Sequence, residues 1–246
     1  MLDELIVIPA RYRSTRLPGK PLVPVGGKPM IVQTHARCLE ALPRERIVVA
    51  TDDERIAEVC RAHDMRVEMT APDHPTGGDR VAEIARRIPA LTYLNVQGDE
   101  PVCDPGDIRA LIDAARADRD RILIGCCPLR DEAEWRDPNC CKLLKSPTGA
   151  LIYIGRAPVP ATRDGVFRGG WRQVCLHAYP RAALDAFAAT GAKTPLEAIE
   201  DHEMLRFLEL GLKVHVIAMS DRSVPVDRPE DVARAEARMR EIGLAA

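Results

Sequence analysis

The chain has 246 residues, and its 35 basic and 37 acidic side chains give a formal net charge of −2. This balance argues against nucleic acid as a partner, because nucleic-acid-binding proteins generally carry an excess of Lys and Arg. A hydrophobic fraction of 46% with 29% charged residues is typical of a folded globular protein. No stretch approaches the ~18 consecutive apolar residues of a membrane span, and the first residues lack a signal-peptide pattern. We therefore expect a cytoplasmic protein without a membrane partner.

Apolar runs alternate with helical patterns up to residue 127. The runs predict strands over 5–8, 46–50, 66–69, 91–96 and 122–127. Helical spacing of apolar residues predicts helices over 30–42, 54–62, 78–88 and 107–117. Strands without polar alternation, separated by helices of ~10–15 residues, indicate a parallel sheet covered on both faces. Ligands of such sheets bind outside the carboxyl ends of the strands.

The pattern changes after about residue 128. Two short strands, 142–144 and 151–154, are joined by a Ser-Pro-Thr-Gly turn. Further elements are predicted as a strand over 174–179, one long helix over 195–210, a strand over 214–218 and a helix over 229–242. We expect one α/β domain over 1–246, with a Rossmann-like, mostly parallel sheet. Residues 128–195 would form a β-rich insert within it.

Eight cysteines are spread over the chain, and none forms a C-x-x-C pair. Two pairs are directly adjacent, Cys126–Cys127 and Cys140–Cys141, which is poor spacing for zinc ligands. We expect the cysteines to serve as small buried hydrophobic residues.

The segment 9–22, directly after the first strand, is the most informative part of the sequence. It carries Arg11, Arg13, Arg16 and Lys20 and no acidic residue. Guanidinium groups and free backbone N–H groups at the end of a strand suit a polyphosphate, although a solvated basic loop would look the same. Neither G-x-G-x-x-G nor G-x-x-x-x-G-K-[ST] is present, which argues against a dinucleotide oxidoreductase and a P-loop protein.

Four segments carry a family resemblance. They are the loop R-x-x-x-x-R-L-P-G-K-P-L from Arg11 to Leu22, His74 to Arg80, Asn95 to Pro101 and Asp227 to Asp231. In order and spacing these segments resemble the motifs of the 3-deoxy-manno-octulosonate cytidylyltransferase family, also called CMP-Kdo synthetases. The resemblance extends from residue 4 to about residue 240. It implies a nucleotide-diphospho-sugar transferase type of fold.

The resemblance also implies a reaction in which an acceptor oxygen attacks the α-phosphate of CTP and pyrophosphate leaves. Asp99 and Asp227 would bind Mg²⁺, while Arg16 and Lys20 would contact the β- and γ-phosphates. Other nucleotide-binding positions implied are Ala10, Arg11, Ser14, Thr76, Gly77, Arg80 and Gln97. From the residues alone, Asp99 could instead cap a loop and Asp227 could cap the last helix. Arg80 could likewise be a solvated helix residue.

The acceptor region departs from the family pattern. The positions implied for an acidic acceptor are Arg156, Arg163, Gln173, His177 and Glu203. Gln173 stands where the family has histidine, His177 where it has tyrosine, and Met204 where it has glutamine. A pocket that loses hydroxyl partners changes its preference. The resemblance implies a Kdo-like 2-keto-3-deoxy sugar acid as the acceptor, and these departures leave a small phosphonate open as the alternative.

Two further alternatives stay open at the level of sequence. The chain could be a catalytically silent nucleotide-binding protein, or a nucleotidyltransferase that uses a base other than cytosine. The partners expected are CTP and a small acidic acceptor. The resemblance further suggests a homodimer, with the insert and the 195–210 helix as its interface.

Overall fold

A central sheet runs through the computed structural model, which describes residues 1–14 and 16–244. Its main strands lie in the order β11-β7-β10-β6-β1-β4-β5. Their bounds are β1 Leu2–Ala10, β4 Ile47–Thr51, β5 Val67–Met69, β6 Ala90–Val96, β7 Ile122–Pro128, β10 Trp171–Pro180 and β11 Val214–Ala218. β1, β4, β6 and β7 match the predicted runs, because each contains a short apolar stretch buried on both faces. β5 also matches its predicted run, although it is only partly buried.

The sheet is mostly parallel, as predicted. β1 pairs in parallel with β4 and β6, β4 with β5, and β11 with β7. Only β10 among these strands runs the other way, antiparallel to both β6 and β7. The hairpin of β8 (Lys142–Lys145) and β9 (Leu151–Gly155) attaches to the start of β10. The stretch 128–195 thus supplies both this hairpin and one strand of the central sheet.

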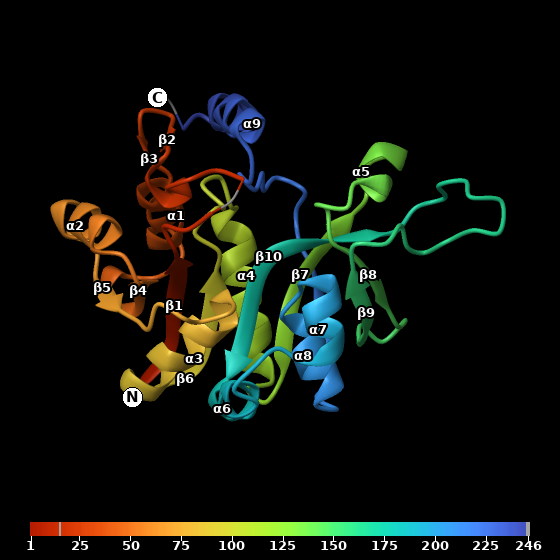
Figure 1. The fold of residues 1–246 in the computed structure, drawn as a ribbon, viewed down its shortest axis with the longest axis horizontal. Coiled ribbons are helices and arrows are strands. Elements are labelled where there is room, and N and C mark those ends of the chain that lie inside the picture. Colours follow the sequence, from red (N-terminus) through yellow and green to blue (C-terminus); the bar gives the residue numbers. More distant parts are fainter. Residues whose placement is uncertain (15, 245–246) are drawn as a thin grey trace.

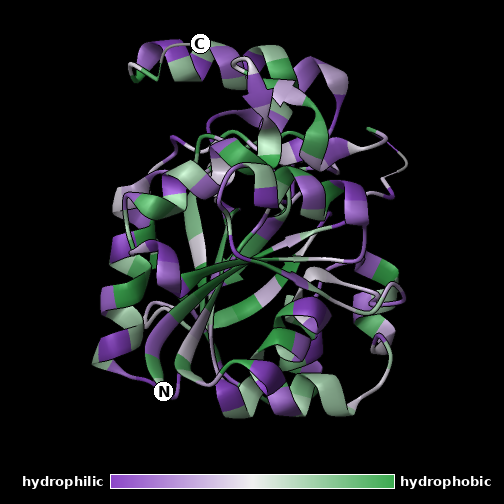
Figure 2. Cartoon of the chain, turned by 90° about the vertical axis from the view of Figure 1, so that its left-hand side faces the viewer, coloured by the Kyte–Doolittle hydropathy of each residue, from purple (hydrophilic) through white to green (hydrophobic). Residues whose placement is uncertain are grey.

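Helices cover both faces of the sheet (Figure 1). One face packs against α1 (Met30–Leu39), α2 (Glu54–Ala62) and α4 (Pro105–Ala117), and the other against α3 (Gly77–Arg87), α6 (Arg181–Ala189) and α8 (Met204–Glu209). Successive residues of β1 alternate between the two cores, with Ile6 and Ile8 on the first face and Leu5 and Val7 on the second. Figure 2 shows green hydrophobic residues concentrated on the central strands.

The prediction of one helix over 195–210 is wrong. The chain instead forms α7 (Pro195–Glu200) and α8, separated by Asp201, which has a left-handed φ of 52°. Aspartate tolerates this conformation better than most residues, so the helical pattern gave no warning of the break. Tertiary contacts stabilise the break between α7 and α8. Glu203, just after it, accepts hydrogen bonds from the backbone N–H of Gly78 and the side-chain amide of Asn95.

The remaining elements are short or peripheral. They are β2 (Pro24–Val25), β3 (Lys28–Pro29), α5 (Glu132–Arg136), α9 (Pro229–Glu241) and the 3₁₀ turns Lys20–Leu22 and Arg44–Arg46. α9 packs on the β2–β3 hairpin through a small apolar cluster that includes Val25, Ala235 and Met239. The cysteines are free thiols, and five of the eight are buried, as expected. Over residues 1–14 and 16–244, every helix is too short or too polar to cross a membrane.

Candidate active site

A pocket of about 800 Å³ opens at the carboxyl ends of β1 and β6, at the upper edge of the sheet in Figure 1. Its lining brings together nearly all the residues that the sequence singled out. They are Ala10, Arg11, Ser14, Arg16, Lys20, Thr76, Gly77, Arg80, Gln97, Asp99, Arg156, Gln173, His177, Glu203 and Asp227. Seven separate segments of the chain contribute to this list, which explains why only the fold could unite them.

Arg163 is the exception among the predicted site residues. It is exposed on the long connection between β9 and β10, which extends away from the body of the molecule in Figure 1, and it does not line the pocket. The sequence assigns Arg163 to the site because it matches a basic position of the family, but that match says nothing about where the β9–β10 connection runs. Within this chain, the prediction that Arg163 lies in the acceptor pocket is therefore wrong.

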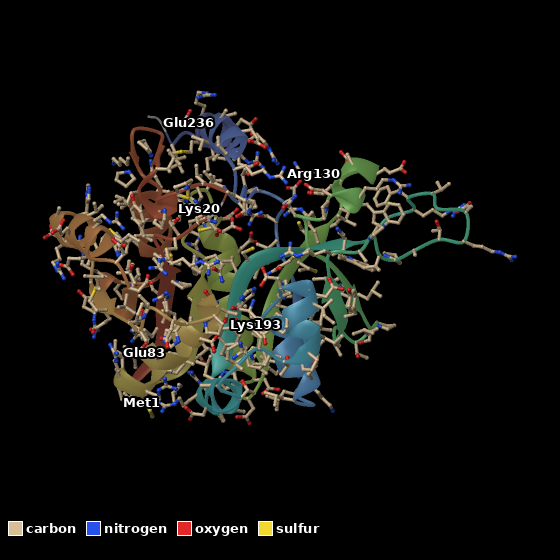
Figure 3. All side chains as sticks on the ribbon, in the orientation of Figure 1. Met1, Lys20, Glu83, Arg130, Lys193 and Glu236 are labelled. Atoms are coloured by element: carbon tan, nitrogen blue, oxygen red, sulfur yellow. The ribbon has the colours of Figure 1, made fainter. Side chains whose placement is uncertain are left out.

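Lys20 is the centre of the charged side of the pocket. Gly19 adopts a left-handed φ of 66°, and the chain then turns so that Lys20 begins a 3₁₀ turn. The Lys20 Nζ lies 2.6 Å from Asp99 Oδ2 and 3.0 Å from Asp227 Oδ1. Arg16 donates to the same Asp227 oxygen at 3.0 Å and to Asn139 Oδ1 at 3.0 Å. Figure 3 shows Lys20 in the upper half of the molecule.

These contacts decide between the alternatives for the two carboxylates. The carboxylate of Asp99 faces Lys20 across the pocket, so it does not act mainly as a loop cap. Asp227 also points at Lys20, and α9 is capped from within by Asp231, which accepts from the backbone N–H of Arg228. Burial lowers the pKa of Lys20, but Asp99 and Asp227 outweigh it and raise the pKa well above its usual value.

The same pair of carboxylates fits a magnesium ion. Asp99 and Asp227 come from different segments, yet their oxygens share one cationic partner, so a divalent cation could take the place of the ammonium. Among the residues that the structure describes, no cluster of three or more His, Cys, Asp or Glu side chains is suited to a metal. A bound Mg²⁺ would therefore complete its octahedron with phosphate oxygens and water.

The start of α3 builds another wall of the pocket. Thr76 caps this helix through a reciprocal pair of hydrogen bonds with Asp79. A Cβ on Gly77 would lie only 3.2 Å from Gln97 Nε2, so glycine allows the helix to approach the loop after β6. Arg80 is 3% exposed and pairs with Asp52 at 3.3 Å, which rules out a solvated helix residue.

Alternate residues of β10 line the opposite side of the pocket. Gln173, Cys175 and His177 share one face, as expected for a strand with a side-chain period of two. Gln173 Nε2 lies 2.8 Å from His177 Nε2, and its Oε1 lies 2.6 Å from His202 Nε2. The other ring nitrogen of His177, Nδ1, lies 3.0 Å from the hydroxyl oxygen of Tyr179. We call these side chains, together with Glu203, the acceptor wall.

Glu203 ends the acceptor wall as a buried carboxylate. It accepts from the Gly78 N–H at 2.7 Å and from the Tyr179 hydroxyl at 3.0 Å. Burial raises the pKa of Glu203, but its contact with His177 and the hydrogen bond from the Gly78 N–H outweigh burial and hold the pKa at about 2. Burial, with a smaller contribution from His177, lowers the pKa of His202 to about 4. The wall therefore combines an ionised carboxylate with a neutral histidine.

Arg156 lines the pocket but is largely committed to structure. Its guanidinium donates to the backbone carbonyls of Glu200, Pro138 and Asp201, at 2.9, 3.0 and 3.3 Å. Arg156 thus holds the break between α7 and α8 in place. Sequence reasoning missed this role, and it missed His202, because the break that brings His202 to the pocket had no signal in the helical pattern.

Comparison with known proteins gives this site a family. The family model for cytidylyltransferases matches residues 5–213. A 3-deoxy-manno-octulosonate cytidylyltransferase from Syntrophotalea carbinolica is 41% identical over 245 residues, covering 95% of this chain and 97% of that protein. A second such enzyme, from Burkholderia lata, is 42% identical over 239 residues, covering 93% of this chain and 90% of that protein. The chain belongs to the 3-deoxy-manno-octulosonate cytidylyltransferase family.

Solved structures agree with this assignment. A CMP:2-keto-3-deoxy-manno-octonic acid synthetase complexed with CTP has a TM-score of 0.88 and 32% identity, with 98% of this chain and 99% of that chain covered. A glucose-1-phosphate thymidylyltransferase from Bacillus anthracis, described as putative, has a TM-score of 0.70 at 16% identity and covers 97% and 96%. The latter shows the shared nucleotidyltransferase fold alone. As a member of the cytidylyltransferase family, the chain is a nucleotidyltransferase enzyme.

Proposed function

We propose that this chain transfers CMP from CTP to 3-deoxy-manno-octulosonate (Kdo) or a closely similar 2-keto-3-deoxy sugar acid, with release of pyrophosphate. The observation that carries the proposal is the pocket itself, in which Arg16, Lys20, Asp99 and Asp227 face the acceptor wall across one cavity. Similarity to a synthetase solved with CTP supports the choice of nucleotide. The relatives named above support the choice of acceptor.

In the proposed reaction an acceptor oxygen forms a bond to the α-phosphorus of CTP, and the bond to the β-phosphate oxygen breaks. Arg16 and Lys20 are placed to neutralise the negative charge that accumulates on the departing pyrophosphate. Asp99 and Asp227 would hold Mg²⁺, which when bound supplies charge neutralisation at the phosphates. Lys20 must exchange its two carboxylate partners for phosphate oxygens when the nucleotide binds.

The acceptor wall has a different task in this proposal. Glu203 accepts hydrogen bonds from two sides, and the neutral histidine His202 adds no charge. Such a surface suits the hydroxyl groups of the sugar acid better than its carboxylate. The side of the pocket with Arg11, Arg13 and Arg16 instead provides charge for the triphosphate. Self-association as a homodimer and a cytoplasmic location stay predictions of the sequence.

A panel assay tests the proposed function. The purified protein is incubated with Mg²⁺ and each of CTP, UTP, ATP and GTP, and pyrophosphate is measured in the presence of Kdo, other 2-keto sugar acids or simple phosphonates. We expect release with CTP and Kdo, dependent on Mg²⁺. Release with a phosphonate alone would favour the alternative acceptor, and no release with any pair would favour a silent nucleotide-binding protein.

A further inference from the structure

His202 was not among the residues predicted from the sequence, yet it lies on the pocket and is 7% exposed. The backbone N–H of Met204 donates to His202 Nδ1 at 3.3 Å. This nitrogen must therefore be unprotonated. A neutral His202 then carries its proton on Nε2, which faces Gln173 Oε1 at 2.6 Å.

The orientation of the Gln173 amide follows from this proton. Because His202 donates to it, the oxygen of Gln173 must face His202, and the amide nitrogen must face His177. The Gln173 N–H then donates to His177 Nε2 at 2.8 Å. Reversing the amide would place the Gln173 NH₂ group against the Nε2–H of His202, so that two donors would face each other. The backbone N–H of Met204 thus fixes the orientation of the Gln173 amide through His202.

The same reasoning fixes the protonation of His177. With Nε2 accepting from Gln173, a neutral ring carries its proton on Nδ1, which faces Tyr179 Oη at 3.0 Å. The hydroxyl of Tyr179 in turn donates to Glu203 Oε1 at 3.0 Å. All four hydrogen bonds then run in one direction, from His202 to Glu203, and each donor meets one acceptor.

We propose that His202 is a positioning residue for the acceptor: it fixes the amide of Gln173, keeps His177 neutral, and leaves the second Gln173 N–H available to an oxygen of the acceptor. The use of that N–H rests on the proposed function. The titratable and charged groups around His202 are His177, Glu203, Arg156 and Asp201. Those facing His177 are Tyr179, Glu203 and His202. Glu203 Oε1 accepts from the Tyr179 hydroxyl at 3.0 Å and also lies 3.6 Å from His177 Nδ1, so its carboxylate faces the side of the ring that carries the proton.

The test compares two substitutions at one position. The substitution His202→Leu removes the group that donates to Gln173. In His202→Gln, the new side-chain amide can still donate a hydrogen bond from nearly the same place. The protonation of His177 is followed by ¹⁵N NMR of histidine-labelled protein without substrate, from pH 8 to 5. In the natural protein and in H202Q we expect the neutral Nδ1–H form of His177 throughout. In H202L the Gln173 amide is free to turn, and His177 should take up a proton at a pH at least one unit higher.

Steady-state kinetics supply the second measurement. H202L should raise the KM for Kdo about tenfold, the effect of losing one well-placed hydrogen bond, while the KM for CTP changes less than twofold. If H202L fails to fold, Gln173→Leu breaks the same link, and its His177 should show the same rise in protonation by NMR.

The outcomes separate the two proposals. An unchanged His177 spectrum in the leucine variants would overturn the role of His202, as would equal increases in the KM values of both substrates. If the natural protein does not use Kdo but the NMR difference is found, the proposed function fails while the control of His177 by His202 stands.

Discussion

The two sides of the pocket solve opposite electrostatic problems. Around Lys20 the charged side chains are partly open to solvent, with Arg16 46% and Asp227 28% exposed. They therefore have room to exchange partners when a charged substrate binds. The acceptor wall is less exposed, since the side chains of His177 and Glu203 are only 2% and 10% exposed. The charged side chains that would change partners on binding are thus the more exposed ones, whereas the hydrogen-bonded groups of the acceptor wall are less exposed.

The largest expected effect comes from the ion cluster that ties the two sides together. Arg206 is fully buried and pairs with Glu197 of α7 at 2.6 Å and with Asp79 of α3 at 2.8 Å. Arg206→Ala should lower the free energy of unfolding by about 3–5 kcal/mol, because two buried carboxylates lose their partner. Urea denaturation measures the loss. Arg121→Ala, which breaks an exposed pair with Asp118, is the matched control and should cost less than about 1 kcal/mol.

Removing a carboxylate from the charged side should stop the chemistry without unfolding the protein. Asp99→Asn is expected to reduce pyrophosphate release about 100- to 1000-fold, the scale for losing one group that stabilises the transition state. Asp104→Asn is the control, because Asp104 caps α4 outside the pocket. Normal turnover by D99N would remove Asp99 from the mechanism and make the charged side a purely structural feature.

Acid should weaken the buried regions through their neutral histidines. Burial lowers the pKa of both His35 and His202 to about 4, with smaller contributions from Arg44 and His177. Their unfolded pKa is about 6.5, so between pH 6.5 and 4 the unfolded chain binds more protons and stability falls with falling pH. The loss should be about 1.4 kcal/mol per pH unit for each histidine. His35→Gln should flatten this dependence, and the exposed His63→Gln should not.

Glu203 acts in a separate pH range. Its folded pKa of about 2 lies below the usual value near 4.3, so its contribution is present above the unfolded pKa and is lost as pH falls from about 4.3 towards 2. Unfolding curves measured from pH 7 to 5 therefore exclude Glu203. Burial raises the pKa of Glu100 to about 7, so Glu100 contributes in this range with the opposite sign, and the difference between the natural protein and H35Q isolates His35. A slope that is unchanged in H35Q would contradict a neutral buried His35.

A smaller effect distinguishes Lys20 from the rest of the charged side. Without CTP, its ammonium competes with a divalent cation for Asp99 and Asp227. Lys20→Met should therefore bind Mn²⁺ about tenfold more tightly in the absence of nucleotide, while binding CTP more weakly. Electron paramagnetic resonance of free Mn²⁺ measures the first effect. The exposed Lys28→Met provides the control, and weaker Mn²⁺ binding by K20M would argue against a metal at these carboxylates.

The smallest effect tests the boundary of the acceptor wall. Arg163 is exposed and outside the pocket, so Arg163→Ala should change kcat/KM for the acceptor less than twofold. Arg156→Ala should raise the KM for the acceptor, because it releases the carbonyls at the break between α7 and α8. A tenfold loss in R163A would show that the exposed connection closes over the pocket during turnover.

The sequence predicted the strands of the first half and the charged side of the pocket because both depend on local signals. Buried parallel strands appear as short apolar runs, and Arg16 and Lys20 lie in one short loop. The acceptor wall depends on tertiary contacts instead. Nothing in the pattern of 195–210 marks a break, since Asp201 adopts its left-handed conformation within a segment of good helical spacing. His202 could not be placed without the hydrogen bonds that reach Gln173.

The reversed direction of β10 has a consequence for how such enzymes diversify. Because β10 alone opposes its neighbours β6 and β7, its early residues lie at the edge where those strands end. Gln173 and His177 thus meet the nucleotide loops without belonging to them. Substitutions on this one strand and on the segment between α7 and α8 can therefore change one side of the pocket without altering the loop that carries Arg16 and Lys20.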